Sequence, residues 1–221
     1  MEEDIFSSPR CPIILFEKKT EHFSHVNSNL HTLGIMRAYT PILDYILSKT
    51  GRDFLIATSA NLSGIPMIID ESDAIQKVDG TCDYVLYHNR KIVRRCDDSV
   101  AFVVKDKFVL TRPGRGFAPL RLKLSSTQFV EKNILALGGH EKATVALKKD
   151  DEVIVSQYLG DLDTKEYIDF YRSALSDLLF LYNLEYDYIA CDLHKNYFST
   201  ALAEEIAQKN NKKIVYVQHH I

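Results

Sequence analysis

Three parts of the sequence combine residue types that bind phosphate groups. In the first, Thr58–Pro66, the polar residues are Ser59, Asn61 and Ser63. Hydroxyls, side-chain amides and free backbone N–H groups at the end of a strand bind phosphate oxygens without bringing charge. The same residue types dominate ordinary turns, and composition alone favours that plainer interpretation.

The second part contains acidic and basic residues a short distance apart, with Asp97, Asp98 and Ser99 followed by Arg112 and Arg115. Arginine side chains can fork around phosphates, and paired aspartates can hold Mg²⁺ or orient those arginines. Taken singly, each residue is explained better by a hairpin with charged flanks. Their combination within about twenty positions favours a nucleotide site.

The third part is the segment Gly138–Lys142, a glycine pair followed by His140, Glu141 and a lysine. In actin-like folds the first hairpin turn lies near the nucleotide phosphates, so Gly139 and Lys142 are candidates to face them. A tight loop with a solvated lysine explains the segment equally well. Further on, Asp192 and His194 end a predicted strand, where α/β folds collect functional side chains, although they could equally cap the next helix.

The composition excludes several classes of protein. The chain has 221 residues, of which 46% are hydrophobic and 26% charged, as in ordinary globular domains. A formal net charge of −3 without a basic run predicts no nucleic-acid partner. The four cysteines form no C-x-x-C pair, which predicts reduced thiols. No apolar stretch reaches the roughly 20 residues that a membrane span needs. The acidic start is unlike a signal peptide, so we expect a cytoplasmic protein.

The elements that must position these residues are predicted from hydrophobic periodicity and capping signals. In the first half, Thr40 precedes Pro41 as an expected N-cap, and a hairpin is expected around residues 105–107. The expected strands there are 11–16, 53–58, 83–87, 99–104 and 108–111, and the expected helices are 41–47 and 71–78.

The stretch 120–133 has no clear period and could be a linker. Beyond it the predicted order is strand–strand–strand–helix–strand–helix–strand, which is typical of the opening half of a ribonuclease-H-like or actin-like domain. The expected strands are 134–138, 143–148, 152–157, 187–192 and 213–217, and the helices are 164–182 and 200–209, the latter capped by Ser199. The predicted fold class is therefore α/β.

Several of these segments resemble known families. Thr58–Pro66 resembles the TSxNxSGxP segment of YrdC-like domains, and Gly34–Pro41 resembles the glycine-to-proline segment of the same domains. Asp97–Val100 and Arg115–Pro119 look specifically like the HypF family, the carbamoyltransferases of [NiFe]-hydrogenase maturation. The segments that resemble the TsaD-like domain of that family are Leu135–Gly138 with Lys142 and Thr144, Ser156–Leu162, and Ala190–His194 with Tyr197, Ser199 and Thr200.

The resemblance implies a domain organisation. Residues 1–122 would be part of a YrdC-like domain of α+β type that makes carbamoyl-adenylate from ATP. Residues 123–133 would be a linker. Residues 134–221 would be the N-terminal part of the TsaD-like, actin-like carbamoyl-transfer domain. The resemblance also implies that the chain is a piece of a larger enzyme, and we expect it to be incomplete alone.

The resemblance further implies the chemistry of the intact enzyme. Carbamate from carbamoyl phosphate is adenylated with ATP and Mg²⁺, and the carbamoyl group then passes to the C-terminal cysteine of a HypE-type acceptor protein. The implied catalytic residues are Arg115 and Asp98. The implied nucleotide-binding residues are Ser59, Asn61, Ser63, Ser99, Lys142, Thr144 and Asp161.

His219 matches the first histidine of an H-x-x-x-H pair that holds a divalent metal, Fe or Zn, in the intact TsaD-like domain. In this chain taken alone, a solvent-exposed His219–His220 pair is the better interpretation. Two other functions stay open. One is threonylcarbamoyl-adenylate chemistry for tRNA modification, against which the Asp97–Val100 and Arg115–Pro119 segments argue. The other is a non-catalytic fragment that binds partners.

Overall fold

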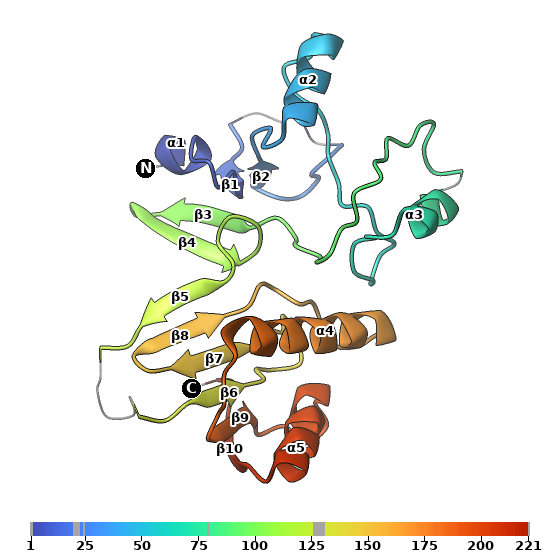
Figure 1. The fold of residues 1–221 in the computed structure, drawn as a ribbon. Coiled ribbons are helices and arrows are strands. Elements are labelled where there is room, and N and C mark those ends of the chain that lie inside the picture. Colours follow the sequence, from blue (N-terminus) through green and yellow to red (C-terminus); the bar gives the residue numbers. More distant parts are fainter. Residues whose placement is uncertain (1, 20–22, 24, 79, 126–130, 221) are drawn as a thin grey trace. The chain divides into compact units, whose positions relative to one another are not determined.

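The computed structural model describes residues 2–19, 23, 25–78, 80–125 and 131–220 of the chain (Figure 1). They form two compact units, each assembled from two separate stretches of sequence. The first unit is Met1–Ala57 with Asp97–Pro119, and the second is Thr58–Cys96 with Leu120–Ile221. Both units combine sheet and helix, which confirms the α/β prediction.

The first unit contains a four-stranded sheet in the order β2-β1-β3-β4. The central pair β1 and β3 is parallel, and the outer pairs are antiparallel. Its elements are α1 (Glu2–Phe6), β1 (Ile13–Glu17), β2 (Thr32–Ile35), α2 (Pro41–Thr50), β3 (Val100–Val104) and β4 (Lys107–Arg112).

Local signals in the sequence explain two elements of this unit. The Thr40 hydroxyl accepts a hydrogen bond from the N–H of Leu43, so Thr40 caps α2 as predicted. The predicted hairpin joins β3 and β4 through Lys105 and Asp106, both of which have positive φ. Two consecutive positive-φ residues are typical of the tight turns that match the twist of antiparallel strands.

Two predicted strands are wrong. Residues 53–58 and 83–87 belong to no strand, and their apolar side chains are largely exposed, with Ile56 72% and Tyr84 93% accessible. A short apolar run becomes a strand only when a neighbouring strand pairs with it, and none of the strands seen in the structure does so here. The predicted helix between them is confirmed as α3 (Glu71–Val78).

The second unit contains a six-stranded sheet in the order β10-β9-β6-β7-β8-β5. Strands β6, β9 and β10 run parallel, whereas β5, β7 and β8 join by antiparallel pairing. The predicted element order after the linker is confirmed. The elements are β5 (Leu120–Lys123), β6 (Ile134–Ala136), β7 (Ala146–Lys149), β8 (Glu152–Val155), α4 (Lys165–Tyr182), β9 (Tyr188–Asp192), α5 (Phe198–Asn210) and β10 (Lys213–Val217).

The start of the presumed linker stretch 120–133 differs from expectation. Leu120–Lys123 pairs with β8 as an edge strand, with Leu120 opposite Val155. Pairing with β8 satisfies the backbone hydrogen bonds of Leu120–Lys123, so this segment forms a strand although its sequence shows no clear period. Residues 126–130 of the predicted linker lie outside the described residues.

The two helices of this unit differ in how they begin. Thr164, where the sequence predicts the helix to begin, caps α4 by accepting the N–H of Tyr167. The predicted cap of α5 is wrong, because the N-cap residue is Tyr197 and Ser199 lies inside the helix, fully buried. None of the helices within the described ranges is long and apolar enough to cross a bilayer.

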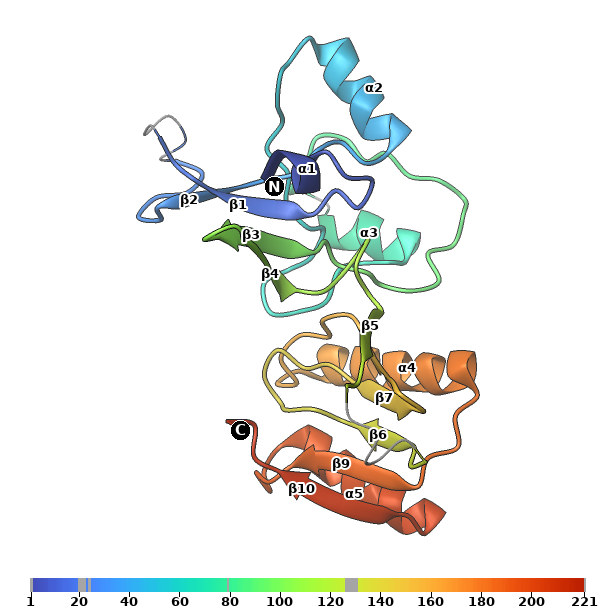
Figure 2. The same cartoon turned by 90° about the vertical axis from the view of Figure 1, so that its left-hand side faces the viewer.

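The core of the second unit lies between its sheet and its helices, with α4 alongside β7 and α5 alongside β9 and β10 (Figures 1 and 2). Tyr171 of α4 is completely buried, and its hydroxyl donates to the carbonyl of Leu137 at 2.5 Å. Burial raises the pKa of Tyr171. The phenol therefore stays a hydrogen-bond donor and ties α4 to the end of β6.

Replacing Tyr171 with Phe keeps the ring but leaves the buried Leu137 carbonyl without this donor. We expect a loss of about 1–3 kcal/mol in the free energy of unfolding, measured by urea denaturation. Tyr216→Phe is the matched control, because its hydroxyl bonds Glu204 at the exposed surface. The control should change stability by no more than about 0.5 kcal/mol. Equal losses in both variants would contradict the assigned role of Tyr171.

Burial, with smaller contributions from Glu204 and Asp192, raises the pKa of the Cys191 thiol to about 11. Because this folded pKa lies above that of an unfolded cysteine, Cys191 stabilises the fold fully below about pH 8.5, and that stability is lost as pH rises towards 11. We expect Cys191→Ser to flatten this alkaline loss of stability.

We also expect iodoacetamide to label the exposed Cys82 in the native protein and Cys191 only after unfolding. Rapid native labelling of Cys191 would contradict the assignment.

Candidate functional site

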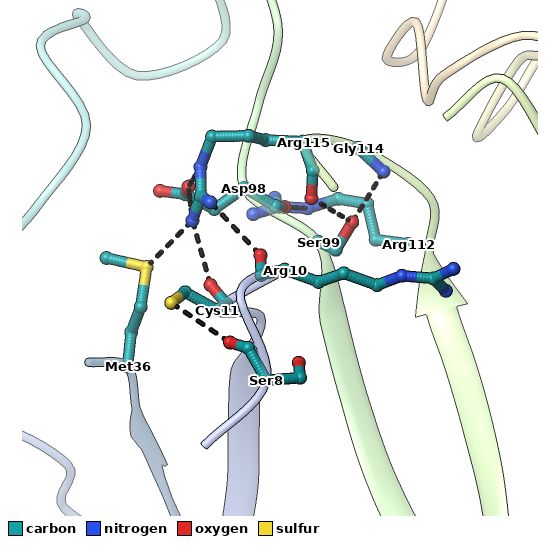
Figure 3. A network of polar contacts seen from close by, with 9 residues as sticks. All are labelled: Ser8, Arg10, Cys11, Met36, Asp98, Ser99, Arg112, Gly114 and Arg115. Carbon is teal, nitrogen blue, oxygen red and sulfur yellow. Dashed lines mark hydrogen bonds and ion pairs between the residues drawn. The ribbon is translucent and has the colours of Figure 1, made fainter. Parts of the chain in front are cut away.

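The guanidinium of Arg115 is the centre of a polar network in the first unit (Figure 3). It donates to Asp98 Oδ1 at 2.9 Å and to the carbonyls of Arg10 and Cys11 at 3.1 and 2.8 Å. It also lies over the ring of Tyr39, 3.5 Å from the ring centre. A single side chain thus joins three separate parts of the chain.

The backbone beside Arg115 is fixed by a buried hydroxyl. Ser99 Oγ accepts the N–H of Gly114 at 2.8 Å and donates to the carbonyl of Arg115 at 3.0 Å. Residue 114 must be glycine, because a Cβ there would lie 2.1 Å from the carbonyl oxygen of Asp97. The predicted residues Asp98, Ser99 and Arg115 therefore do come together.

Their contacts bear on the predicted roles. The Asp98 carboxylate accepts a hydrogen bond from Arg115, and the other Arg115 nitrogens donate to the backbone carbonyls of Arg10 and Cys11. Ser99 is fully buried with both of its hydrogen bonds made inside the protein. In this arrangement the three residues hold the first unit together, and their predicted contact with nucleotide stays a prediction.

The predicted residues Ser59, Asn61 and Ser63 lie in the second unit, in a loop without strand structure. The Asn61 amide donates to the carbonyls of Leu62 and Ile65 at 3.1 and 3.0 Å, and its oxygen accepts the Ser59 hydroxyl. Asn61 therefore braces the turn from inside, as the plainer interpretation holds. The hydroxyls of Ser59 and Ser63 belong to exposed residues.

A second group of polar residues gathers where the parallel strands β6, β9 and β10 end. Parallel neighbours place their carboxyl ends at one edge of the sheet, so residues distant in sequence meet there. The segment after β6 carries His140 and Lys142, the end of β9 carries Asp192, and the segment after β10 carries His219.

The glycine-rich loop after β6 is held against the segment that precedes α4. The N–H of Lys142 donates to Asp161 Oδ1 at 2.6 Å, so these two predicted residues are neighbours. Gly138 has φ +64°, and a Cβ there would lie 2.4 Å from the carbonyl oxygen of Thr144. Because only glycine permits this approach of two backbones, the loop is closed tightly, and the side chain of Lys142 remains exposed.

Asp192 is a carboxylate that is only 4% exposed. Its Oδ1 accepts the N–H of His194 at 2.7 Å, and its Oδ2 lies 2.8 Å from Nδ1 of His219. Burial alone raises the pKa of Asp192, but these hydrogen bonds and the nearby imidazoles outweigh it, and the pKa is lowered from its ordinary value. Asp192 therefore does not cap α5. It orders the end of its own strand and the end of β10.

Rings stack beside this carboxylate. Tyr197 lies between His194 and His140, with ring centres 4.2 and 5.2 Å away, and contacts His219 at 5.9 Å. His140 Nδ1 accepts the N–H of Phe198 at 3.3 Å, so an imidazole bonds the first N–H of α5. Sequence reasoning missed this use of His140, because the contact spans 58 residues.

The predicted metal site is incomplete in the part of the chain that the structure describes. No group of three or more His, Cys, Asp or Glu side chains there is arranged to hold a metal ion. His219 has one close carboxylate, Asp192, whose two oxygens both accept hydrogen bonds. These residues do not fit a complete metal centre by themselves, and His219 as a ligand stays a prediction.

Sequence reasoning also missed how Arg95 and Gln157 join two stretches of the second unit. Gln157 Nε2 donates to the carbonyl of Arg95 at 2.5 Å, and Arg95 Nε donates to the carbonyl of Met67 at 2.7 Å. The Arg95 guanidinium lies 5.5 Å from the ring centre of Phe170 on α4. The family-like segment around Gln157 was the one available signal.

Replacing Arg115 with Lys keeps the charge but loses the fork that reaches Asp98 and two carbonyls. We expect the first unit to lose about 1.5–3 kcal/mol, read as faster hydrogen exchange of the β1 and β3 amides. Arg121→Lys is the control, because Arg121 pairs with Glu152 at the exposed surface. This substitution should change the free energy of unfolding by less than about 1 kcal/mol. Unchanged exchange in the Arg115 variant would show that the network is dispensable.

Comparison with known proteins identifies the two parts of the chain. Residues 1–114 match the Sua5/YciO/YrdC family model, described as telomere recombination, and residues 130–221 match the HypF Kae1-like domain. The probable carbamoyltransferase HypF of Methanocaldococcus jannaschii is 40% identical over 99% of this chain. The carbamoyltransferase HypF of Synechocystis is 36% identical over 100% of it.

Two solved structures share the fold. A crystal structure of full-length HypF in the phosphate- and nucleotide-bound form aligns with 99% of the chain at 34% identity and a TM-score of 0.89. HypF of T. kodakarensis aligns with 99% at 34% identity and a TM-score of 0.91. The chain spans only 29% and 28% of the lengths of the Methanocaldococcus and Synechocystis relatives. The chain therefore belongs to the Sua5/YciO/YrdC family through its first part, its second part matches the HypF Kae1-like domain, and its whole length is similar to part of the HypF carbamoyltransferases.

Proposed function

We propose that the whole protein containing this chain activates a carbamoyl group with ATP and transfers it to a protein thiol. Carbamate released from carbamoyl phosphate attacks the α-phosphorus of ATP, and pyrophosphate leaves, which gives carbamoyl-adenylate. The C-terminal cysteine thiolate of a HypE-type acceptor then attacks the carbamoyl carbon, and AMP leaves. The phosphate leaving group makes the carbamoyl carbon reactive, and preorganised positive charge stabilises the charge that develops. The proposed reaction involves no nucleic acid or membrane, and we propose that it takes place in the cytoplasm.

One observation supports a nucleotide site within this chain. The loop Gly138–Lys142 closes against Asp161, and Lys142 is exposed in the segment that follows the parallel strand β6. A tight glycine loop brings backbone N–H groups close to a ligand, and a lysine adds a positive charge. We propose that Lys142, Thr144 and Asp161 form the nucleotide region of the Kae1-like part, with Mg²⁺ bound to the phosphates. One of the similar HypF structures is described as phosphate- and nucleotide-bound, which agrees with this proposal.

The proposed roles in the first part need a change of contacts. Arg115 and Asp98 pair with each other, so an adenylate that takes either one must replace that ion pair. In the first unit, we propose that Ser99 holds the turn that carries Arg115. In the second unit, we propose that the exposed residues Ser59 and Ser63, with Asn61 through its turn, bind nucleotide. We further propose that His219 supplies one ligand to the Fe or Zn of the whole protein, with the other ligands coming from outside the described residues.

Calorimetric titration with ATP and Mg²⁺ tests the nucleotide region. Lys142→Ala should weaken binding about tenfold, or about 1.4 kcal/mol, because a phosphate contact is lost. Lys149→Ala is the control, since Lys149 is an exposed lysine at the opposite end of β7. Equal weakening by both variants, or no binding by the folded wild-type chain, would refute a nucleotide site in this loop.

The chain alone should not complete the reaction. We expect no ATP- and carbamoyl-phosphate-dependent modification of a HypE-type acceptor by the 221-residue protein, measured by intact mass of the acceptor. The whole protein should modify it. Transfer by the chain alone would contradict this division of labour.

A further inference from the structure

Two histidines at the same end of the second sheet each lie beside one aspartate, but their surroundings differ. His140 Nε2 lies 3.0 Å from Asp163 Oδ1, and His219 Nδ1 lies 2.8 Å from Asp192 Oδ2. A neutral imidazole has one N–H donor and one lone-pair acceptor, and its hydrogen bonds decide which nitrogen is which.

His140 is constrained by a backbone group. The N–H of Phe198 can only donate, and it points at His140 Nδ1 over 3.3 Å. Nδ1 must therefore carry the lone pair, and Nε2 must carry the hydrogen that is donated to Asp163. Both ring nitrogens of His140 are thus occupied.

His219 is constrained in the opposite sense. Asp192 accepts the N–H of His194 through one oxygen and faces His219 Nδ1 with the other. A carboxylate can only accept, so Nδ1 of His219 must carry the hydrogen. Nε2 then carries the lone pair, and none of the hydrogen bonds among the described residues uses it.

We infer that Asp192 is a positioning residue that holds His219 as the Nδ1–H tautomer, while the N-terminus of α5 holds His140 as the Nε2–H tautomer. Of these two imidazoles, only His219 then offers a lone pair for a metal ion or a proton. The carboxylate partner also raises the basicity of Nε2, so Nε2 donates its lone pair more strongly, as in carboxylate–histidine pairs beside metals. The use of this lone pair in the enzyme rests on the proposed function, whereas the tautomers themselves do not.

The fold explains why Asp192 can act in this way. Its strand β9 pairs in parallel with β10, and Asp192 lies opposite Val217, two residues before His219. The Thr200 hydroxyl donates to the Asp192 carbonyl at 3.1 Å, which also ties this residue to α5. The carboxylate is therefore fixed on a strand, and its position does not depend on a loop.

Long-range ¹H–¹⁵N correlation spectra of the histidine rings test the inference, at a pH of about 8 where free imidazole is neutral. In the wild-type chain, we expect a protonated-type Nδ1 for His219 and a protonated-type Nε2 for His140. A protonated-type Nε2 in wild-type His219, or the same tautomer at both histidines, would overturn the inference.

Asp192→Asn should reverse the tautomer of His219 alone. The N–H of His194 will keep the amide oxygen, so the amide NH₂ group will face Nδ1 and demand a lone pair there. Asp163→Asn is the matched control, because the N–H of Phe198 still fixes His140 and the amide oxygen can accept from Nε2. An unchanged His219 in a folded Asp192→Asn chain, verified by its amide spectrum, would also overturn the inference.

This experiment separates the tautomer assignment from the proposed function. If both wild-type tautomers are as inferred but the whole protein takes up no metal and transfers no carbamoyl group, the proposed function fails and the assignment of Asp192 stands. If His219 carries its hydrogen on Nε2, the assignment fails whatever the activity of the whole protein.

Discussion

A carboxylate removed from water needs hydrogen-bond donors, and the arrangement at the end of the second sheet follows from how Asp192 obtains them. One donor is the backbone of its own strand end, and the other is an imidazole delivered by the neighbouring parallel strand. Without these donors the burial of Asp192 would cost several kcal/mol. Strand pairing, the position of His219 and the local charge are therefore consequences of one constraint.

The first unit meets a similar constraint with the opposite charge. The Arg115 guanidinium supplies donors to the backbone carbonyls of Arg10 and Cys11, and Asp98 balances its charge. A residue type that suggests phosphate binding in the sequence thus has a structural use. Any ligand that recruits Arg115 has to compensate those carbonyls, which favours a coupled rearrangement over simple docking.

Much of the fold follows from local signals in the sequence. Thr40 marks the start of α2 correctly, because a capping hydroxyl acts within three residues of its partner. Strand predictions fail where the partner is not local. Residues 53–58 have apolar side chains, but none of the strands in the described part of the chain pairs with them, whereas Leu120–Lys123 lacks a clear pattern yet pairs with β8. The predicted cap at Ser199 is wrong because α5 begins at Phe198, two residues before the predicted start at Thr200.

The candidate site was predictable only in part. Lys142 and Asp161 were assigned to one nucleotide region by resemblance, and the structure brings them into contact. The roles of His140 and Asp192 depend on which backbone N–H groups face them, and those groups belong to other elements. Residue type and spacing alone do not determine these contacts, since they depend on the register of β6, β9 and β10.

The most direct test of the account is to map where ATP and Mg²⁺ perturb the backbone amide signals of the ¹⁵N-labelled chain. Nucleotide bound at the proposed site should change the signals of Gly138–Lys142 and Asp161 most, with smaller changes around Tyr197 where α5 begins. Changes confined to Ser59–Ser63 or to Arg115, with the ends of the parallel strands unaffected, would contradict it.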